Sequence, residues 1–299
     1  MKSISQHLLT GNNLAHVVVY FLLGFIALFL IYSLVRSTFF KRTYKGFKFT
    51  TKKITYIAMM TAVSSAVTIV ISLTLPITVL PPVRMSFEGI MIKVAGMFFG
   101  PLVGMLVGLI TELITIMFVP SYIHIAYLLL ELGVGFLSGI AAISQKWTGK
   151  RKWWTFLVIN LFIIIYGTIM VLITSSYDQN VKIFGAEISR DAYKFVFIGV
   201  LAASLFVIWM VVGVFLVIKR EQLLDIVLPI ILLCVITEFL ATTLIGSWGD
   251  SAFLGIPRDS GGYTSILMVR LVESPLKILF NTIILSTVYY ILRPLVKAK

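Results

Sequence analysis

The sequence predicts an all-α, polytopic membrane protein, and three observations support that prediction. Of the 299 residues, 59% are hydrophobic and only 12% are charged, about half the charged share of a soluble domain. The apolar residues form unbroken runs of about 20, the length that a helix needs to cross a bilayer, whereas barrel strands would alternate over about ten residues. The mean hydropathy is +1.04. A soluble enzyme, a disordered chain and a nucleic-acid-binding module are therefore excluded.

Nine apolar segments follow one another along the chain. The third and fourth are short and meet at Gly100 and Pro101, where the proline is expected to begin a new helix after a tight turn. The first is interpreted as a membrane anchor and not as a signal peptide, because positive charges follow it and no small-residue cleavage site ends it. The expected spans are residues 14–35, 54–75, 88–100, 101–118, 124–144, 154–174, 194–218, 226–246 and 266–292.

Lys and Arg are unevenly divided between the two ends of these spans. If the loop after the first span is cytoplasmic, that side receives 16 of them and the other side receives 6. This is the positive-inside pattern of membrane proteins, so we expect the N-terminus outside the cell and the C-terminus in the cytoplasm. The net charge of +13 is then mostly a topology signal, and no nucleic-acid partner is needed.

Seven ionisable residues fall inside the predicted spans, where charged side chains are costly and usually face one another or a cavity. Arg270, Glu273 and Lys277 lie on one stripe of the last span because they are three and four residues apart. One interpretation is a set of salt bridges between helices. The other, which we favour for the group, is a polar pocket that opens toward the outer face. The remaining members are Lys93, Glu112, Glu131 and Glu238.

Small residues recur at every fourth position in two segments. Ala58, Ala62 and Ala66 make a flat ridge that another helix can approach closely. That helix belongs either to this chain or to a partner subunit. Glycine recurs with the same spacing across residues 96–108, interrupted by Pro101, which predicts a tightly packed helical hairpin.

Motifs for catalysis and cofactor binding are absent from the sequence. Cys234 is the only cysteine and there are three histidines, so neither an intrachain disulfide nor a zinc site is expected. No glycine-rich loop ends in Gly-Lys-Ser or Gly-Lys-Thr, and no Ser-His-Asp or His-Glu-x-x-His pattern occurs. The chain is therefore not expected to be an enzyme or to hold a cofactor. His124 lies beside Tyr122 at an outer helix end, either as a structural residue or at the mouth of a pocket.

Two stretches carry a resemblance to a known family. The first, VRMSFEGIMIKVAGMFFGPLVGMLVGLITELI, resembles the signature hairpin of the substrate-binding membrane subunits (S components) of energy-coupling-factor vitamin transporters, and it is closest to the folate-type group. The alanine ridge lies in the helix before it, where this family keeps its coupling face. The C-terminal VRLVESPLKILFNTIILSTVYYIL is similar to the family's last helix. The resemblance covers about 54–145 and 226–293.

The resemblance implies a six-helix core in an all-α membrane protein. Those helices would be the spans at 54–75, 88–100, 101–118, 124–144, 226–246 and 266–292. The spans at 14–35, 154–174 and 194–218 have no counterpart in such a core. The chain then divides into an anchor and basic linker over 1–53, four core helices over 54–145, a two-helix insertion over 146–222 and two core helices over 223–299.

The resemblance also implies a vitamin-binding site formed by loops at 76–88, 119–124 and 247–265. Arginine side chains would clamp carboxylates and aromatic rings would stack on a flat heterocycle. Folate is the first choice of ligand, and riboflavin or another B-type vitamin follows it, because Glu88 and Lys93 are charged where small or apolar residues are expected. The candidate substrate-binding residues are Arg84, Ser86, Glu88, Lys93, Tyr122, His124, Glu131, Trp248, Arg270, Glu273 and Lys277.

The function that follows is the substrate-binding subunit of an importer in the plasma membrane. Its implied partners are a transmembrane coupling subunit, which would dock on Ala58, Ala62 and Ala66, and two cytoplasmic ATP-binding subunits. A different hypothesis is a stand-alone ion-coupled transporter that uses the carboxylates of the spans as a proton or sodium relay. A third is a membrane scaffold without a ligand. The relay would comprise Glu112, Glu131, Glu238 and Glu273.

Overall fold

The computed structural model describes residues 8, 11–39, 51–74, 89–118, 123–174, 181–183, 186–188, 190–255 and 262–297. Eight of its helical stretches are long and apolar enough to cross a membrane, which confirms the all-α polytopic class. The first helices are α2 (Asn13–Phe39), α3 (Thr51–Thr74), α5 (Ile90–Phe99), α6 (Pro101–Phe118) and α7 (Ile125–Ala141). They are followed by α8 (Lys152–Thr174), α9 (Arg190–Val217), α10 (Leu224–Ile236), α11 (Gly246–Phe253) and α12 (Gly262–Lys297).

Shorter elements connect these helices. The 3₁₀ turns η1 (Ala142–Lys146) and η2 (Gly149–Arg151) lead into α8, and η3 (Glu221–Leu223) leads into α10. The strands β1 (Val181–Ile183) and β2 (Ala186–Ile188) form a small antiparallel hairpin before α9. The π-helix η4 (Thr237–Ile245) joins α10 to α11 without a break, so the expected span at 226–246 is the middle of one longer rod.

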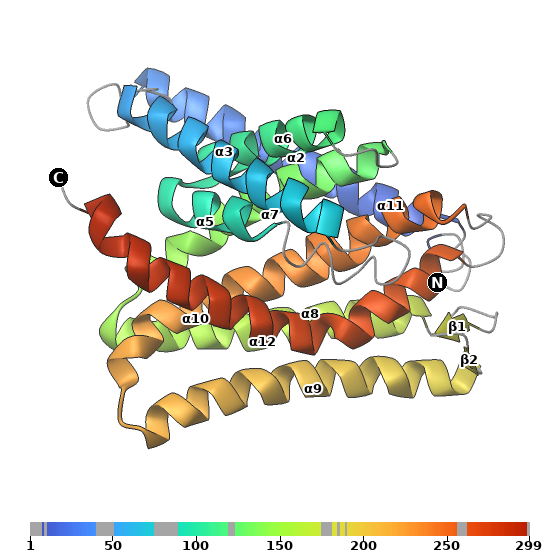
Figure 1. Cartoon of the computed structure of the whole chain (residues 1–299). Coiled ribbons are helices and arrows are strands. Elements are labelled where there is room, and N and C mark those ends of the chain that lie inside the picture. The colour runs from blue at the N-terminus through green and yellow to red at the C-terminus, as the bar shows by residue number, and fades with distance from the viewer. Residues whose placement is uncertain are drawn as a thin grey trace.

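The rod of α10, η4 and α11 lies at the centre of the molecule. In Figure 1, α2, α3 and α6 lie on one side of it, α8 and α9 lie on the other, and α12 crosses it. The rod contacts α7 and α12 along its length and contacts α8 mainly through α10. Of its most apolar 18-residue stretch 72% is buried, against 28% for those of α8 and α9. The expected insertion helices therefore lie at the periphery, although they pack on the core.

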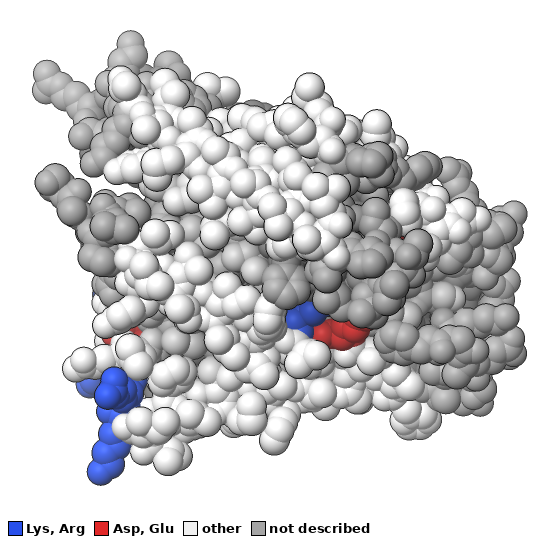
Figure 2. Space-filling model, viewed as in Figure 1, with Lys and Arg blue, Asp and Glu red and all other residues white. Residues whose placement is uncertain are grey.

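The basic connections gather at one end of the molecule. Figure 1 shows the α7–α8 turn, the α9–α10 turn and the C-terminal end of α12 at its left end, and Figure 2 shows exposed basic side chains there. The exposed cations of the two turns are Lys146, Lys150, Arg151, Lys219 and Arg220. These connections therefore lie at the same end of the molecule. That this end faces the cytoplasm stays a prediction from the charge count.

The predicted glycine-rich hairpin is present, and a third helix completes it. Gly100 has a positive φ of 91° and separates α5 from α6. The glycines of both helices face α7, where a Cβ at Gly96 would lie 2.6 Å from the carbonyl oxygen of Gly135. A Cβ at Gly104 or Gly135 would likewise overlap the backbone of the opposite helix. These helices therefore touch backbone to backbone, as small residues at helix interfaces permit.

Candidate ligand-binding site

A buried ion pair links α12 to α11. The Arg270 guanidinium is fully buried, and its Nε and Nη2 donate to Oδ2 of Asp250 at 2.9 and 2.6 Å. Oδ1 of Asp250 accepts a hydrogen bond from the Tyr127 hydroxyl on α7 at 3.1 Å. A Cβ at Gly246 would lie 2.6 Å from Nη1 of Arg270, so only glycine leaves room for this guanidinium. Three helices are joined here by charge-assisted hydrogen bonds.

The π-helix η4 supplies backbone acceptors to this network. Nη1 of Arg270 donates to the carbonyl oxygen of Thr242 at 2.8 Å, and the Tyr263 hydroxyl donates to that of Leu244 at 3.0 Å. A π-helical turn changes the hydrogen bonding of the main chain, and such turns are frequent at functional sites. Side chains of α12 therefore satisfy carbonyls of η4 in the middle of the membrane-spanning rod.

An aromatic cluster covers the same end of the rod. The Trp248 ring packs edge-on against His16 of α2 and against His124, with ring centroids 4.6 and 4.9 Å apart. His124 is the N-cap of α7, where its Nδ1 accepts a hydrogen bond from the backbone N–H of Ala126 at 3.2 Å. This bond fixes the ring orientation. The cluster is connected to the ion pair through Tyr127, whose ring also lies against His124.

A second group of charges lies farther along α12. Nζ of Lys277 is 2.8 Å from Oε2 of Glu273 and 4.0 Å from Oε1 of Glu238 on η4. Glu238 is only 1% exposed, and both its carboxylate oxygens lack a hydrogen-bond partner among the described residues. Oδ1 of Asn281, one turn farther along α12, is also buried without one. Figure 2 shows basic and acidic atoms side by side in the middle of the face that α12 crosses.

Lys93 and Glu131 converge at the start of α5. A Cβ placed on Gly89 would lie 3.9 Å from Cε of Lys93 and 3.8 Å from Oε2 of Glu131 on α7. Both side chains are buried, at 2% and 6% exposure. Because α5 has only ten residues, it is about 15 Å long and covers half of a bilayer core of about 30 Å. The first residues of α5 therefore lie near the middle of the bilayer if its other end reaches the membrane surface.

The alanine ridge of α3 faces outward. Ala58, Ala62 and Ala66 are all exposed, and no described helix of this chain covers them. The opposite face of α3 is buried against α5 and α6 and carries four hydroxyl residues, each at most 5% exposed. Their hydroxyl groups have no hydrogen-bond partner among the described residues. They are Thr61, Ser64, Ser65 and Thr68.

Residues 48–209 match the family described as ECF-type riboflavin transporter, S component. The chain belongs to this family. The match covers more than half of the chain, from just before α3 to most of α9, and so includes α8. No curated protein and no solved structure matches the chain. The protein is thus an S component, the substrate-binding membrane subunit of an energy-coupling-factor (ECF) transporter, as the sequence resemblance predicts at this level.

The structure of this S component places the candidate site residues in three groups. Trp248, His124 and Arg270 meet at the α11 end, Glu273 and Lys277 form an ion pair on α12, and Lys93 and Glu131 meet beside Gly89. Arg84, Ser86, Glu88 and Tyr122 lie outside the described residues. The expected loop at 247–265 is wrong for its first part, because α11 continues the rod through Phe253.

Sequence reasoning missed three residues of the candidate site. Asp250 is the partner of Arg270, Tyr127 binds Asp250, and His16 comes from the helix that was expected to lie outside the core. Asp250 could have been found as the only carboxylate near the outer end of the expected span at 226–246, since a buried arginine needs a counter-charge. Among the described residues, no three His, Cys, Asp or Glu side chains come together as metal ligands.

Proposed function

We propose that this S component captures riboflavin from outside the cell and delivers it inward with ATP-driven partner subunits. The single observation that carries the choice of ligand is the charge balance of the buried site. Three cations, Lys93, Arg270 and Lys277, face four carboxylates among the described residues. The carboxylates are Glu131, Glu238, Asp250 and Glu273.

Such a balance suits a neutral ligand better than an anionic one. Folate carries two carboxylates and would need unpaired cations, but Arg270 is bound to Asp250 and Lys277 lies beside two glutamates. Riboflavin is uncharged, and its ring and hydroxylated chain both donate and accept hydrogen bonds. Glu238 and Asn281 have acceptor atoms without a hydrogen-bond partner in the described part of the chain, and these atoms can bind such donors. We therefore place riboflavin before folate, reversing the preference drawn from the sequence.

The aromatic cluster supports a flat ligand at the outer end of the rod. Trp248 is half-buried and His16 and His124 present their rings to it. Rings of this kind contribute large apolar contact area and hold a planar heterocycle by stacking. In this proposal the ring of the vitamin lies near Trp248, and the polar groups of α12 and η4 bind its hydrophilic atoms.

Ligand binding by the purified full chain tests this proposal. The protein is extracted in a mild detergent, the small molecules that co-purify are identified by mass spectrometry, and riboflavin is then titrated while its fluorescence is followed. We expect quenching with riboflavin and no competition by folate. Competition by folate, or binding of folate alone, would reject riboflavin and leave the assignment to the S components intact.

Transport would depend on partners that dock on α3. We propose that the coupling subunit contacts the exposed alanine ridge and that ATP hydrolysis occurs on two cytoplasmic subunits. The competing hypothesis of ion-coupled transport draws on the buried Glu238 carboxylate. The purified chain in liposomes, loaded with a proton or sodium gradient but without partners, distinguishes the two: riboflavin uptake there would reject the dependence on partner subunits.

A further inference from the structure

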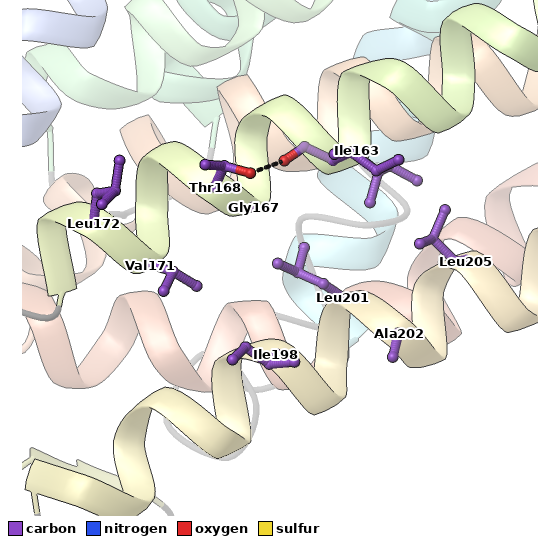
Figure 3. A pocket seen from close by; sticks show the side chains of 10 residues that line it. Ile163, Gly167, Thr168, Val171, Leu172, Ile198, Leu201, Ala202 and Leu205 are labelled. Carbon is purple, nitrogen blue, oxygen red and sulfur yellow. Dashed lines mark hydrogen bonds between the residues drawn. The ribbon is translucent and has the colours of Figure 1, made fainter.

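An apolar groove runs between α8 and α9, away from the candidate ligand-binding site. Figure 3 shows side chains of both helices pointing toward each other across it. Its volume is about 400 Å³. The floor is formed where Gly167 meets Leu201, because a Cβ on this glycine would lie 2.5 Å from Cδ1 of that leucine. The groove is lined by Ile163, Ile164, Gly167, Thr168, Val171, Leu172, Ile198, Leu201, Ala202 and Leu205.

The chemistry of the groove suits a hydrocarbon chain. Its only hydroxyl, that of Thr168, donates to the carbonyl oxygen of Ile164 at 2.8 Å and is therefore not free for a polar ligand. Ile164, Leu172 and Ile198 are 56%, 53% and 51% exposed. The groove lies within two candidate membrane spans, so these exposed aliphatic side chains face lipid tails.

A lysine lies beyond the groove, toward the N-terminal end of α9. Lys194 lies one helical turn before Ile198, and the spacing of 194, 198, 202 and 205 places all four on one face of α9. Lys194 is half-buried and begins the candidate span of this helix. A lysine at this depth extends its ammonium group to the headgroup region, where it attracts anionic lipids.

We propose that this groove binds one anionic phospholipid, with an acyl chain between α8 and α9 and the phosphate at Lys194. The lipid comes from the leaflet opposite the basic turns, because Lys194 and those turns lie at opposite ends of α9. The site holds a lipid of defined charge, and it is independent of the vitamin and of the partner subunits.

Native mass spectrometry of the full chain in a mild detergent tests this site. Phosphatidylglycerol or phosphatidylcholine with identical acyl chains is added to the wild type and to three variants. Ala202→Phe fills the groove from an exposed position, and Lys194→Gln removes the cation. Ala203→Phe is the matched control, since Ala203 is exposed on the same helix but does not line the groove.

We expect the wild type and Ala203→Phe to retain one phosphatidylglycerol in preference to phosphatidylcholine. Ala202→Phe should lose most of the retained lipid of either kind. Lys194→Gln should lower the preference for phosphatidylglycerol by about five-fold, the effect of one lysine beside an anionic lipid surface. Circular dichroism spectra and melting temperatures close to those of the wild type would show that the variants fold.

Three results would overturn the proposal. The first is equal retention of the two lipids by the wild type. The second is retention of lipid by Ala202→Phe to the same extent as by the Ala203→Phe control. The third is a change of oligomeric mass in Ala202→Phe with unchanged lipid retention, which would assign the groove to a second copy of the chain.

Discussion

Arg270 illustrates how a single residue can be located from sequence while its role depends on the fold. The sequence places this arginine inside an apolar span, where it needs a partner. The partner lies 20 positions away, on α11, and Asp250 reaches it only because α11 and α12 pack together. The ion pair between Arg270 and Asp250 therefore forms only when the tertiary structure does. Arg270 serves first as a link between helices.

Removing one member of this pair should destabilise the protein strongly. Arg270→Met leaves Asp250 buried without its cation, and we expect a loss of about 3–5 kcal/mol in the free energy of unfolding. Thermal unfolding in detergent, followed by circular dichroism, measures it. The double variant Arg270→Met/Asp250→Leu should recover part of the loss, because no unpaired charge remains. A single variant as stable as the wild type would show that the pair is not structural.

The contact of α6 with α7 is the tightest helix pairing in the described part of the chain, and its cause is visible in the sequence only in part. The glycine repeat predicts close packing, but it does not say which helix packs against the glycines of α5 and α6. Gly135 and Gly139 of α7 complete the interface, and they are spaced by four as in the hairpin. Two rows of glycines can pack together only if both helices are rotated so that the rows face each other. The sequence pattern does not specify that rotation.

Gly135→Ala should disturb this contact. Its Cβ would overlap the backbone of Gly104, which cannot move as a flexible side chain can, so we expect a loss of about 1–3 kcal/mol. Gly199→Ala on α9 is the control, because nothing lies within 4 Å of a Cβ there and alanine favours a helix. The melting temperatures of the two variants should therefore change in opposite directions, and equal changes would contradict the contact.

The exposed ridge of α3 is the element on which coupling is proposed to depend. Ala62→Trp should abolish vitamin uptake in cells that express the complete transporter and should leave vitamin binding by the isolated chain unchanged. A large side chain would separate the two helix backbones that alanine allows to approach. Ala203→Trp, exposed on α9, is the control and should transport normally. Normal uptake by the Ala62→Trp variant would exclude this face as the docking surface.

The whole molecule has its basic turns at one end and the aromatic cluster of the candidate site toward the other. The charge distribution predicts that the basic end faces the cytoplasm. Cys234 is 1% exposed, so the natural chain is a suitable background for cysteine labelling. We expect an impermeant maleimide to label the Leu254→Cys variant on intact cells and the Lys219→Cys variant only after the membrane is opened. Both positions are exposed. The reverse result would place the candidate site on the cytoplasmic side.

The sequence by itself determined the class of the protein, the order of its apolar segments, the end at which its cations gather and its membership among the S components. Those properties depend on composition and on local spacing, because a bilayer accepts only apolar helices with satisfied backbones. Tertiary structure alone decided which charges neutralise one another, that a π-helix lies within the expected span at 226–246, and that the outward face of α3 is its alanine face. Ion pairs, glycine contacts and the groove between α8 and α9 arise where separate helices meet, and the relative rotation of those helices is set by packing over the whole interface.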